Sequence, residues 1–217
     1  KGLSGFRRFL DVMETVPEIQ DNPDAVELTN VKGHVCYENV SFHYSDDETE
    51  VLSHVSIDIP AGKSVALVGP SGGGKTTICS LLPRFYDVTK GRVLVDGVDV
   101  KDYSPEVLRS RIGIVPQKAV LFAGTIAENL RWGKKDASKE EMWKALEISQ
   151  SKEFVEKKDG QLESRIEQGG KNLSGGQRQR LTIARALVRQ PEILILDDSA
   201  SALDYATDAA LRKAIRN

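Results

Sequence analysis

Hydrophobic and polar positions follow two different periods along this chain, and the changes of period mark out its elements. In the first 14 residues, apolar side chains recur at spacings of three and four, which predicts an amphipathic helix that ends before Pro17. Short runs rich in valine, isoleucine and aromatic residues then predict strands. The predicted strands cover residues 35–42, 51–59, 64–68, 92–95, 111–115 and 192–196.

Helical patterns separate the later strands. Ser138 opens a capping-box pattern, and Ser174 fits the N-cap of a long helix. Ser104 followed by Pro105 also fits a helix start. Because strands alternate with helices, we predict an α/β fold with a mostly parallel central sheet and a mainly helical lobe at about 118–190. The predicted helices cover residues 76–85, 138–149, 174–189 and 204–216, with another after Ser104.

Composition narrows the class of protein. The chain has 217 residues, of which 40% are hydrophobic and 29% charged, enough for one ordinary core and a polar surface. Its net charge of −2 argues against a globally basic nucleic-acid binder, and we expect no nucleic-acid partner. Cys36 and Cys79 lack the spacing of a cysteine zinc site or a disulfide scaffold. Because the chain begins at Lys1 without a methionine, we expect it to be cut from a longer protein.

The strongest motif reads GPSGGGKT at residues 69–76, between a predicted strand and a predicted helix. Its glycines allow backbone N–H groups to turn inward around phosphate oxygens. Lys75 can reach the β- and γ-phosphates, and the Thr76 hydroxyl can bind Mg²⁺. The alternative is a glycine-rich turn with an incidental lysine.

An apolar strand ends in a pair of carboxylates at residues 193–198, which read ILILDD. Such a strand can place Asp197 beside the phosphate loop, where a carboxylate helps to hold Mg²⁺. Many strands end in aspartate, so this pattern gains its weight from the phosphate-loop motif that precedes it.

A second glycine-rich motif reads LSGGQ at residues 173–177. A helix cap explains Ser174 alone. It does not explain two glycines in the first turn, because each costs about 1 kcal/mol in a helix. The motif therefore indicates close approach to an anion.

With these three motifs in this order, nearly the whole chain resembles the ATPase domain of ABC transporters. The resemblance implies a P-loop fold of ABC type, with an antiparallel β subdomain and a helical subdomain beside the parallel sheet. It also implies ATP and Mg²⁺ as ligands. The implied catalytic residues are Lys75, Gln117 and Asp198, and the implied metal ligands are Thr76, Gln117 and Asp197. The implied nucleotide-binding residues are Tyr44, Gly69, Ser71, Gly72, Gly73, Gly74, Lys75, Thr76, Thr77, Ser174, Gly175, Gly176, Gln177 and Asp204.

In that family, an aromatic residue at the position of Tyr44 stacks on adenine, Gln117 belongs to the Q-loop, and residues 201–204 form the D-loop. The alternatives are a strand aromatic that fills the core for Tyr44 and a polar residue at a strand end for Gln117. Two such domains close head to tail, so that ATP lies between the P-loop of one and the LSGGQ of the other. The resemblance therefore implies a second ATPase domain as a homodimer or heterodimer partner.

The subtype resembles exporters of the multidrug and lipid half-transporter kind. Residues 1–33 resemble the linker from an upstream transmembrane domain, and residues 34–217 the ATPase domain. ENVSF at 38–42 and LFAGTIAEN at 121–129 are similarly exporter-like. The resemblance implies an exporter motor at the cytoplasmic face of a membrane, with a transmembrane domain in the same polypeptide.

Three positions depart from the family pattern. Asp198 stands where the family usually has a glutamate as general base, and Gln168 stands where exporters often have glutamate. The switch histidine of the family would lie beyond Asn217, so the chain is expected to end before it. We consider two hypotheses: a degenerate site within a heterodimer, or a homodimer that tolerates Asp198. A non-hydrolysing regulatory module and a soluble ABC ATPase are the rival functions.

Overall fold

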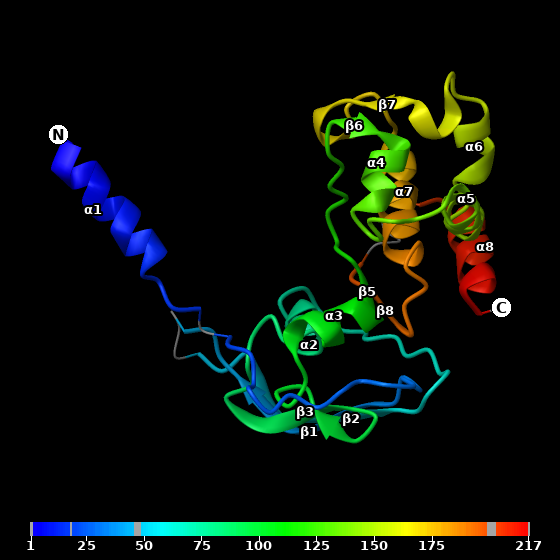
Figure 1. The fold of residues 1–217 in the computed structure, drawn as a ribbon. Coiled ribbons are helices and arrows are strands. Elements are labelled where there is room, and N and C mark those ends of the chain that lie inside the picture. Colours follow the sequence, from blue (N-terminus) through cyan, green and yellow to red (C-terminus); the bar gives the residue numbers. More distant parts are fainter. Residues whose placement is uncertain (1, 18, 46–48, 199–202, 217) are drawn as a thin grey trace.

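The computed structural model describes residues 2–17, 19–45, 49–198 and 203–216. An antiparallel sheet with the strand order β2-β1-β3-β4 forms one layer (Figure 1). Along β1, Val35 lies opposite Ile59 of β2 and Val95 of β3, and the side chains of β1 alternate between buried and part-buried near its start. This alternation fits a sheet with one face on the core. The strands are β1 (Val35–Phe42), β2 (Leu52–Ile59), β3 (Lys90–Val95) and β4 (Val98–Asp99).

A parallel pair forms the centre of the molecule. Strands β5 (Ile112–Val115) and β8 (Ile193–Leu196) run side by side in register, and the helices α2 (Lys75–Leu81) and α3 (Pro105–Arg111) lie close to them in Figure 1. Helix α2 is shorter than the predicted 76–85. It ends at Leu81 because Pro83 has no N–H group to donate to the helix.

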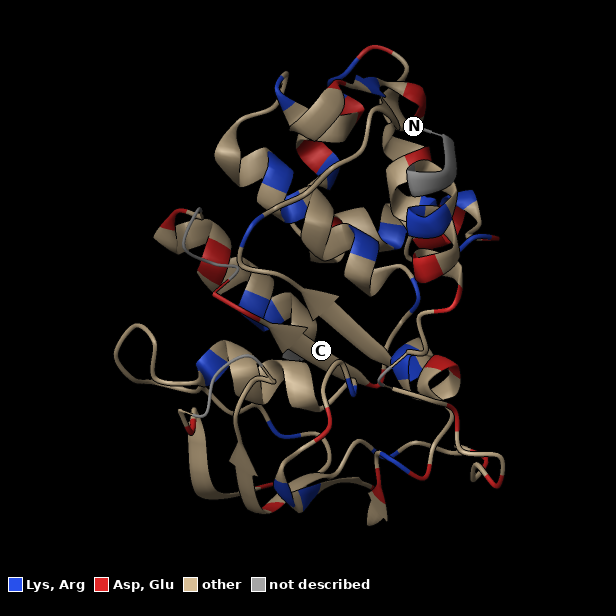
Figure 2. Cartoon of the chain, turned by 90° about the vertical axis from the view of Figure 1, so that its left-hand side faces the viewer, with Lys and Arg blue, Asp and Glu red and all other residues tan. Residues whose placement is uncertain are grey.

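The helical part has its own hydrophobic core. Its buried residues come from α4, α5, α6 and α7 together with the intervening turns, and Figure 1 shows these helices gathered at the end away from the antiparallel sheet. Figure 2 shows basic and acidic residues interspersed along the helices. The elements are β6 (Gly124–Thr125), α4 (Ile126–Arg131), α5 (Lys139–Ile148), α6 (Lys152–Glu156), β7 (Arg165–Ile166), α7 (Gly175–Leu187) and α8 (Tyr205–Arg216), with short 3₁₀ turns at Gln161–Glu163 and Gln168–Gly170.

The strand predicted at 64–68 is wrong. Residues 63–70 have no strand structure, and Val65 and Val68 are 52% and 93% exposed. Strand propensity depends on packing against neighbouring strands. None of the described strands pairs with this segment, so its apolar composition alone does not make it extended.

The first helix, α1 (Gly2–Met13), stands away from the rest of the chain (Figure 1). Phe6, Phe9, Val12 and Met13 are each more than half exposed, so the apolar side of this amphipathic helix is not covered by the described part of the chain. None of the helices described here is both long enough and apolar enough to cross a lipid bilayer.

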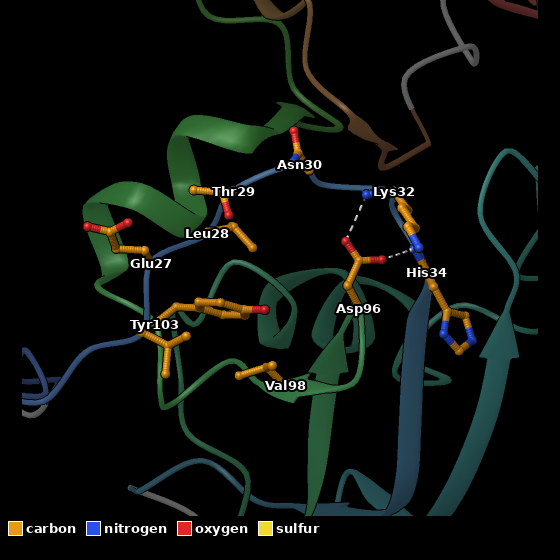
Figure 3. A pocket seen from close by; sticks show the side chains of 10 residues that line it. Glu27, Leu28, Thr29, Asn30, Lys32, His34, Asp96, Val98 and Tyr103 are labelled. Atoms are coloured by element: carbon orange, nitrogen blue, oxygen red, sulfur yellow. Dashed lines mark hydrogen bonds between the residues drawn. The ribbon is translucent and has the colours of Figure 1, made fainter.

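The segment after α1 is fixed to the antiparallel sheet. The Asp96 carboxylate accepts the backbone N–H groups of Lys32, Gly33 and His34 at 2.8, 3.4 and 2.9 Å. Figure 3 shows this contact at the edge of a hollow of about 450 Å³, which also has Tyr103 in its lining. Residues 32–34 are therefore held by a side chain more than 60 residues away.

Candidate functional site

The glycine-rich loop takes a shape that side chains would prevent. Gly72 and Gly74 both have φ of +79°, a region that residues with a Cβ rarely adopt. A Cβ on Gly74 would also lie 2.6 Å from the Leu52 side chain. Gly73 N–H donates to the Pro70 carbonyl at 3.2 Å and closes the turn. The predicted phosphate loop is thus a glycine-dependent turn that leads directly into α2.

Lys75 lies over this loop. Its Nζ atom donates to the carbonyl oxygens of Gly69 and Pro70, at 2.9 and 2.7 Å. Neither partner is a carboxylate, so these two bonds do not neutralise the ammonium group. Its positive charge can still attract an anion. Ser71 and Gly72 are exposed beside it. The role of Lys75 toward the β- and γ-phosphates remains a prediction.

Thr76 and Asp197 meet although they are 121 residues apart in the sequence. The Thr76 hydroxyl donates to Asp197 Oδ1 at 3.1 Å. Asp197 follows β8, and its N–H donates to the Val115 carbonyl, which extends the parallel pairing by one residue. A hydroxyl and a carboxylate are hard oxygen ligands, so the pair fits the Mg²⁺ that the sequence predicts.

The thiol of Cys79 lies near this carboxylate. Burial, and then the negative charge of Asp197, raise the pKa of Cys79 to about 11. The thiol is therefore protonated near neutral pH, and its nucleophilicity is low because the thiolate is the reactive form.

Gln117 and Asp198 also meet. The Gln117 side-chain amide donates to Asp198 Oδ2 at 3.2 Å, and both residues are exposed. Asp198 has φ of +45°, which turns the chain directly after Asp197. The structure thus brings the ends of β5 and β8 together with the start of α2, and four predicted residues share one surface: Thr76, Gln117, Asp197 and Asp198.

Tyr44 lies on the other side of α2. Its hydroxyl is 3.0 Å from Thr77 Oγ1, and its ring is nearly perpendicular to those of Phe42 and Tyr86. Tyr44 is half-buried and packs at the edge of the sheet core. The Tyr44 ring therefore packs against the core, as the alternative interpretation predicts. Its hydroxyl also contacts the helix that follows the phosphate loop.

The LSGGQ motif begins α7 with the predicted cap. Ser174 Oγ accepts Gln177 N–H at 3.2 Å, and Gln177 Oε1 accepts Ser174 N–H at 3.1 Å. Gly175 and Gly176 lie between them in the first turn, where Gly175 is exposed and Gly176 is half-buried. A helix of 13 residues is about 20 Å long, and the far end of α7 leads to β8 (Figure 1). None of the described hydrogen bonds joins this motif to the phosphate loop.

Asp204 caps α8. Its carboxylate accepts the backbone N–H and the hydroxyl of Thr207 at 2.9 and 2.7 Å, and these bonds hold the pKa of Asp204 below its ordinary value. The predicted nucleotide-binding role of Asp204 remains a prediction. Ser201 and Ala202 of the predicted D-loop lie outside the described residues.

Two long-range contacts had no signal in the sequence. The bond from Thr77 to Tyr44 and the hold of Asp96 on residues 32–34 join residues that lie 33 or more positions apart. No local pattern predicts which distant partner a hydroxyl or a carboxylate will meet.

Comparison with known proteins supports this assembly. The family model described as "ABC transporter" matches residues 52–201. The uncharacterized ABC transporter ATP-binding protein YwjA of Bacillus subtilis is 45% identical over all of this chain, and the ATP-dependent lipid A-core flippase of Desulfotalea psychrophila is 40% identical over all of it. The chain spans only 37% and 38% of these two relatives.

A solved structure is similar over nearly the whole chain. It is described as a bacterial Atm1-family ABC exporter with ATP bound, and it matches 99% of this chain and 37% of its own with a TM-score of 0.93 at 38% identity. This likeness confirms the predicted fold class and the exporter-type resemblance. Together with the family model and the two relatives, it shows that the chain belongs to the ABC transporter family.

Proposed function

We propose that this chain is the ATP-binding motor domain of an ABC exporter, which hydrolyses Mg-ATP and passes the resulting movement to a transmembrane domain. The observation that carries the proposal is the pair of contacts from Thr76 to Asp197 and from Gln117 to Asp198. These contacts support the proposal, because the side chains to which we assign the metal and the attacking water lie together beside the glycine-rich loop.

Each group then has a defined task. Lys75 and the N–H groups of the loop from Gly69 to Gly74 bind the β- and γ-phosphates, and Thr76 and Asp197 hold Mg²⁺, with Gln117 as a further ligand. Mg²⁺, when bound, supplies positive charge against the phosphate oxygens. Gln117 and Asp198 face the same space, where Gln117 orients the attacking water and Asp198 accepts its proton. Tyr44 stacks on the adenine.

The LSGGQ motif acts on a second domain. Its first turn lies at the end of α7 away from β8, so Ser174 to Gln177 are turned away from the loop of their own chain. A head-to-tail dimer would set this exposed, anion-friendly helix start against the nucleotide of the partner, with Asp204 near the interface.

We further propose that residues 1–33 are the linker from a transmembrane domain and that residues 34–217 are the ATPase domain, with its helical lobe at about 118–190. The exposed apolar side of α1 supports the linker, since such a side needs a partner outside this chain. Both relatives are more than twice as long as the match. The domain would then lie at the cytoplasmic face of a membrane.

Asp198 points to a weak site. Its side chain is one methylene shorter than the glutamate that the family usually has, and Gln117 holds its carboxylate in this structure. A poorly placed base costs about 10²–10⁴ in rate. We therefore favour a heterodimer, in which this chain binds ATP, hydrolyses it slowly, and completes the partner's site with its LSGGQ. A module that binds ATP without turnover is the second candidate, and it rests on the same residue.

The test measures Mg-ATP binding by calorimetry and phosphate release in parallel, for the wild type and for Asp198→Glu. We expect binding in both proteins and faster release only with glutamate. Steady release from the wild type at the rate of the variant would mean that Asp198 suffices and would favour the homodimer. A wild-type chain that binds no ATP would end the proposal.

A further inference from the structure

We propose that Arg189 is a positioning residue that fastens the helical lobe to the part of the molecule that carries the phosphate loop, and so fixes the angle at which the LSGGQ motif is presented. The inference rests on the proposed function, because it takes the LSGGQ motif as the part that meets a partner domain. Its new content is the task of Arg189, which lies just beyond the opposite end of α7 from that motif.

The guanidinium group of Arg189 bridges two segments that are far apart in the sequence. Its Nε atom donates to the Gly133 carbonyl at 2.9 Å, and its Nη1 atom donates to the Arg109 carbonyl at 2.9 Å. Gly133 follows α4 of the helical lobe, whereas Arg109 belongs to α3, which leads into β5 (Figure 1). Because the guanidinium group is planar and its N–H groups point in fixed directions, two bonds from it set the relative position of both acceptors.

The lobe side of this bridge is packed tightly on α7. A Cβ built on Gly133 would overlap the Arg185 carbonyl and lie 2.7 Å from the Val188 side chain, so the Gly133 backbone rests directly on the last turn of the helix. This end of α7 contributes Val188 to the lobe core and Ala186 to a second core that also contains Val115 of β5. The end of α7 is therefore the place where the lobe and the parallel strands meet.

The other side of the bridge leads to the helix after the phosphate loop. The Arg109 side chain donates from Nε to the Pro83 carbonyl at 2.9 Å and from Nη2 to the Arg84 carbonyl at 2.6 Å. Both carbonyls follow the end of α2, where a cation is favourable because the helix dipole is negative there. Arg189 is thus joined, through Arg109, to the helix that begins at Lys75.

This geometry predicts which property depends on Arg189. The residue is exposed, so water competes for its two carbonyl partners, and the lobe keeps its own hydrophobic core without them. Loss of the bridge should therefore leave the lobe folded but let it tilt about the end of α7. Because α7 is about 20 Å long, such a tilt displaces the LSGGQ motif at its far end. ATP binding at this chain's own phosphate loop should be unaffected.

The first measurement follows the orientation of the lobe in the absence of nucleotide. Spin labels are attached through Lys144→Cys on α5 and Lys90→Cys on β3, which are both exposed positions, in a background of Cys36→Ser and Cys79→Ser. Pulsed electron spin resonance then gives the distribution of distances between the two labels. We expect one narrow distribution when Arg189 is present and a broader or shifted one with Arg189→Met.

Two further variants separate the bridge from the charge. Arg189→Lys keeps the charge on a single nitrogen, so its distance distribution should lie between those of the wild type and Arg189→Met. Arg131→Met removes an exposed charge from the last turn of α4 and should leave the distribution unchanged. The proposal would be overturned by an unchanged distribution in Arg189→Met, by full restoration with lysine, or by an equal effect of Arg131→Met.

The second measurement tests the functional consequence in the unlabelled protein. Arg189→Met should raise the Kd of ATP-dependent dimerisation, measured by light scattering, about three- to tenfold, which is the size of one hydrogen bond. The Kd for Mg-ATP at the chain's own site, measured by calorimetry, and the midpoint of thermal unfolding should stay close to the wild-type values. Weaker ATP binding or a wild-type dimerisation Kd in Arg189→Met would contradict the proposed task. A wild type that binds no ATP would instead refute the proposed function, while the label distances still decide the role of Arg189.

Discussion

The helical lobe and the phosphate-loop region satisfy their polar groups in opposite ways. In the lobe, three helices begin with complete capping boxes, at Thr125, Ser138 and Ser174, and core residues such as Met142 and Leu146 are fully buried. In the loop region, residues 63–70 form no strand, and the Lys75 ammonium group bonds to the Gly69 and Pro70 carbonyls of its own loop.

This difference separates the groups that stabilise the fold from the groups that can bind a ligand. A helix that caps itself has few groups left for a ligand, and its stability comes from burial and short-range bonds. The loop instead holds a cation and glycines at positive φ, a combination that suits an anion. Stability and function are thus separated along the chain, with Ser174 at the point where they overlap.

The largest expected effect lies in the lobe. Leu146→Ala should lower the free energy of unfolding by about 2–5 kcal/mol, because it leaves a cavity in a fully buried core. Urea denaturation measures this loss, and the exposed Lys139→Ala is the matched control, expected within about 0.5 kcal/mol of wild type. A loss below about 1 kcal/mol for Leu146→Ala would mean that the core closes around the gap.

Lys75→Ala should weaken ATP binding and leave the stability of the fold nearly unchanged, the opposite of Leu146→Ala. Losing a charge-assisted contact worth about 1.5–3 kcal/mol should raise the Kd for Mg-ATP about 10- to 150-fold. The free energy of unfolding should change little, because the bonds of Lys75 within the described residues go to two carbonyls of its own loop. Lys63→Ala, on the exposed segment before the loop, controls for net charge. If both variants lost the same affinity, general electrostatics rather than the loop would explain it.

The sequence predicts the helical lobe and the phosphate-loop region to different extents. The capping box at Ser138 and the helix cap at Ser174 are predicted correctly, because both partners of such a cap lie within one turn. The strand at 64–68 was wrong because a strand needs a neighbour that composition cannot specify. The placement of Asp197 beside Thr76 was predicted from the order of the motifs, which carries long-range information that no single element has.

Contacts outside any motif could not be predicted. The bond between Tyr44 and Thr77 depends on how β1 and α2 pack, and the three N–H groups held by Asp96 depend on the path of the segment after α1. In both cases the residue type allows many partners, and only the tertiary structure selects one.

The contact between Asp96 and residues 32–34 therefore gives a third, intermediate prediction. Asp96→Ala removes the acceptor of three backbone N–H groups and should destabilise residues 32–34 by about 1–3 kcal/mol. Hydrogen exchange should show the faster opening at these amides, with the helical lobe unchanged. Asp102→Ala is the control, since the exposed Asp102 contributes its backbone carbonyl to Val26 and keeps it after substitution. Uniformly faster exchange across the chain would contradict a local role.

The smallest expected effect separates helix stability from function most directly, because Ser138 and Ser174 make the same cap in two different helices. Ser138 and Ser174 each accept the N–H group three residues later at 3.2 Å within a complete capping box. Ser138→Ala and Ser174→Ala should therefore each cost about 0.5–2 kcal/mol of stability, as measured by urea denaturation. Only Ser174→Ala should also weaken ATP-dependent dimerisation, measured by light scattering. If Ser138→Ala weakened dimerisation equally, the Ser174 effect would be one of helix stability, and the proposed contact with a partner's nucleotide would lose its support.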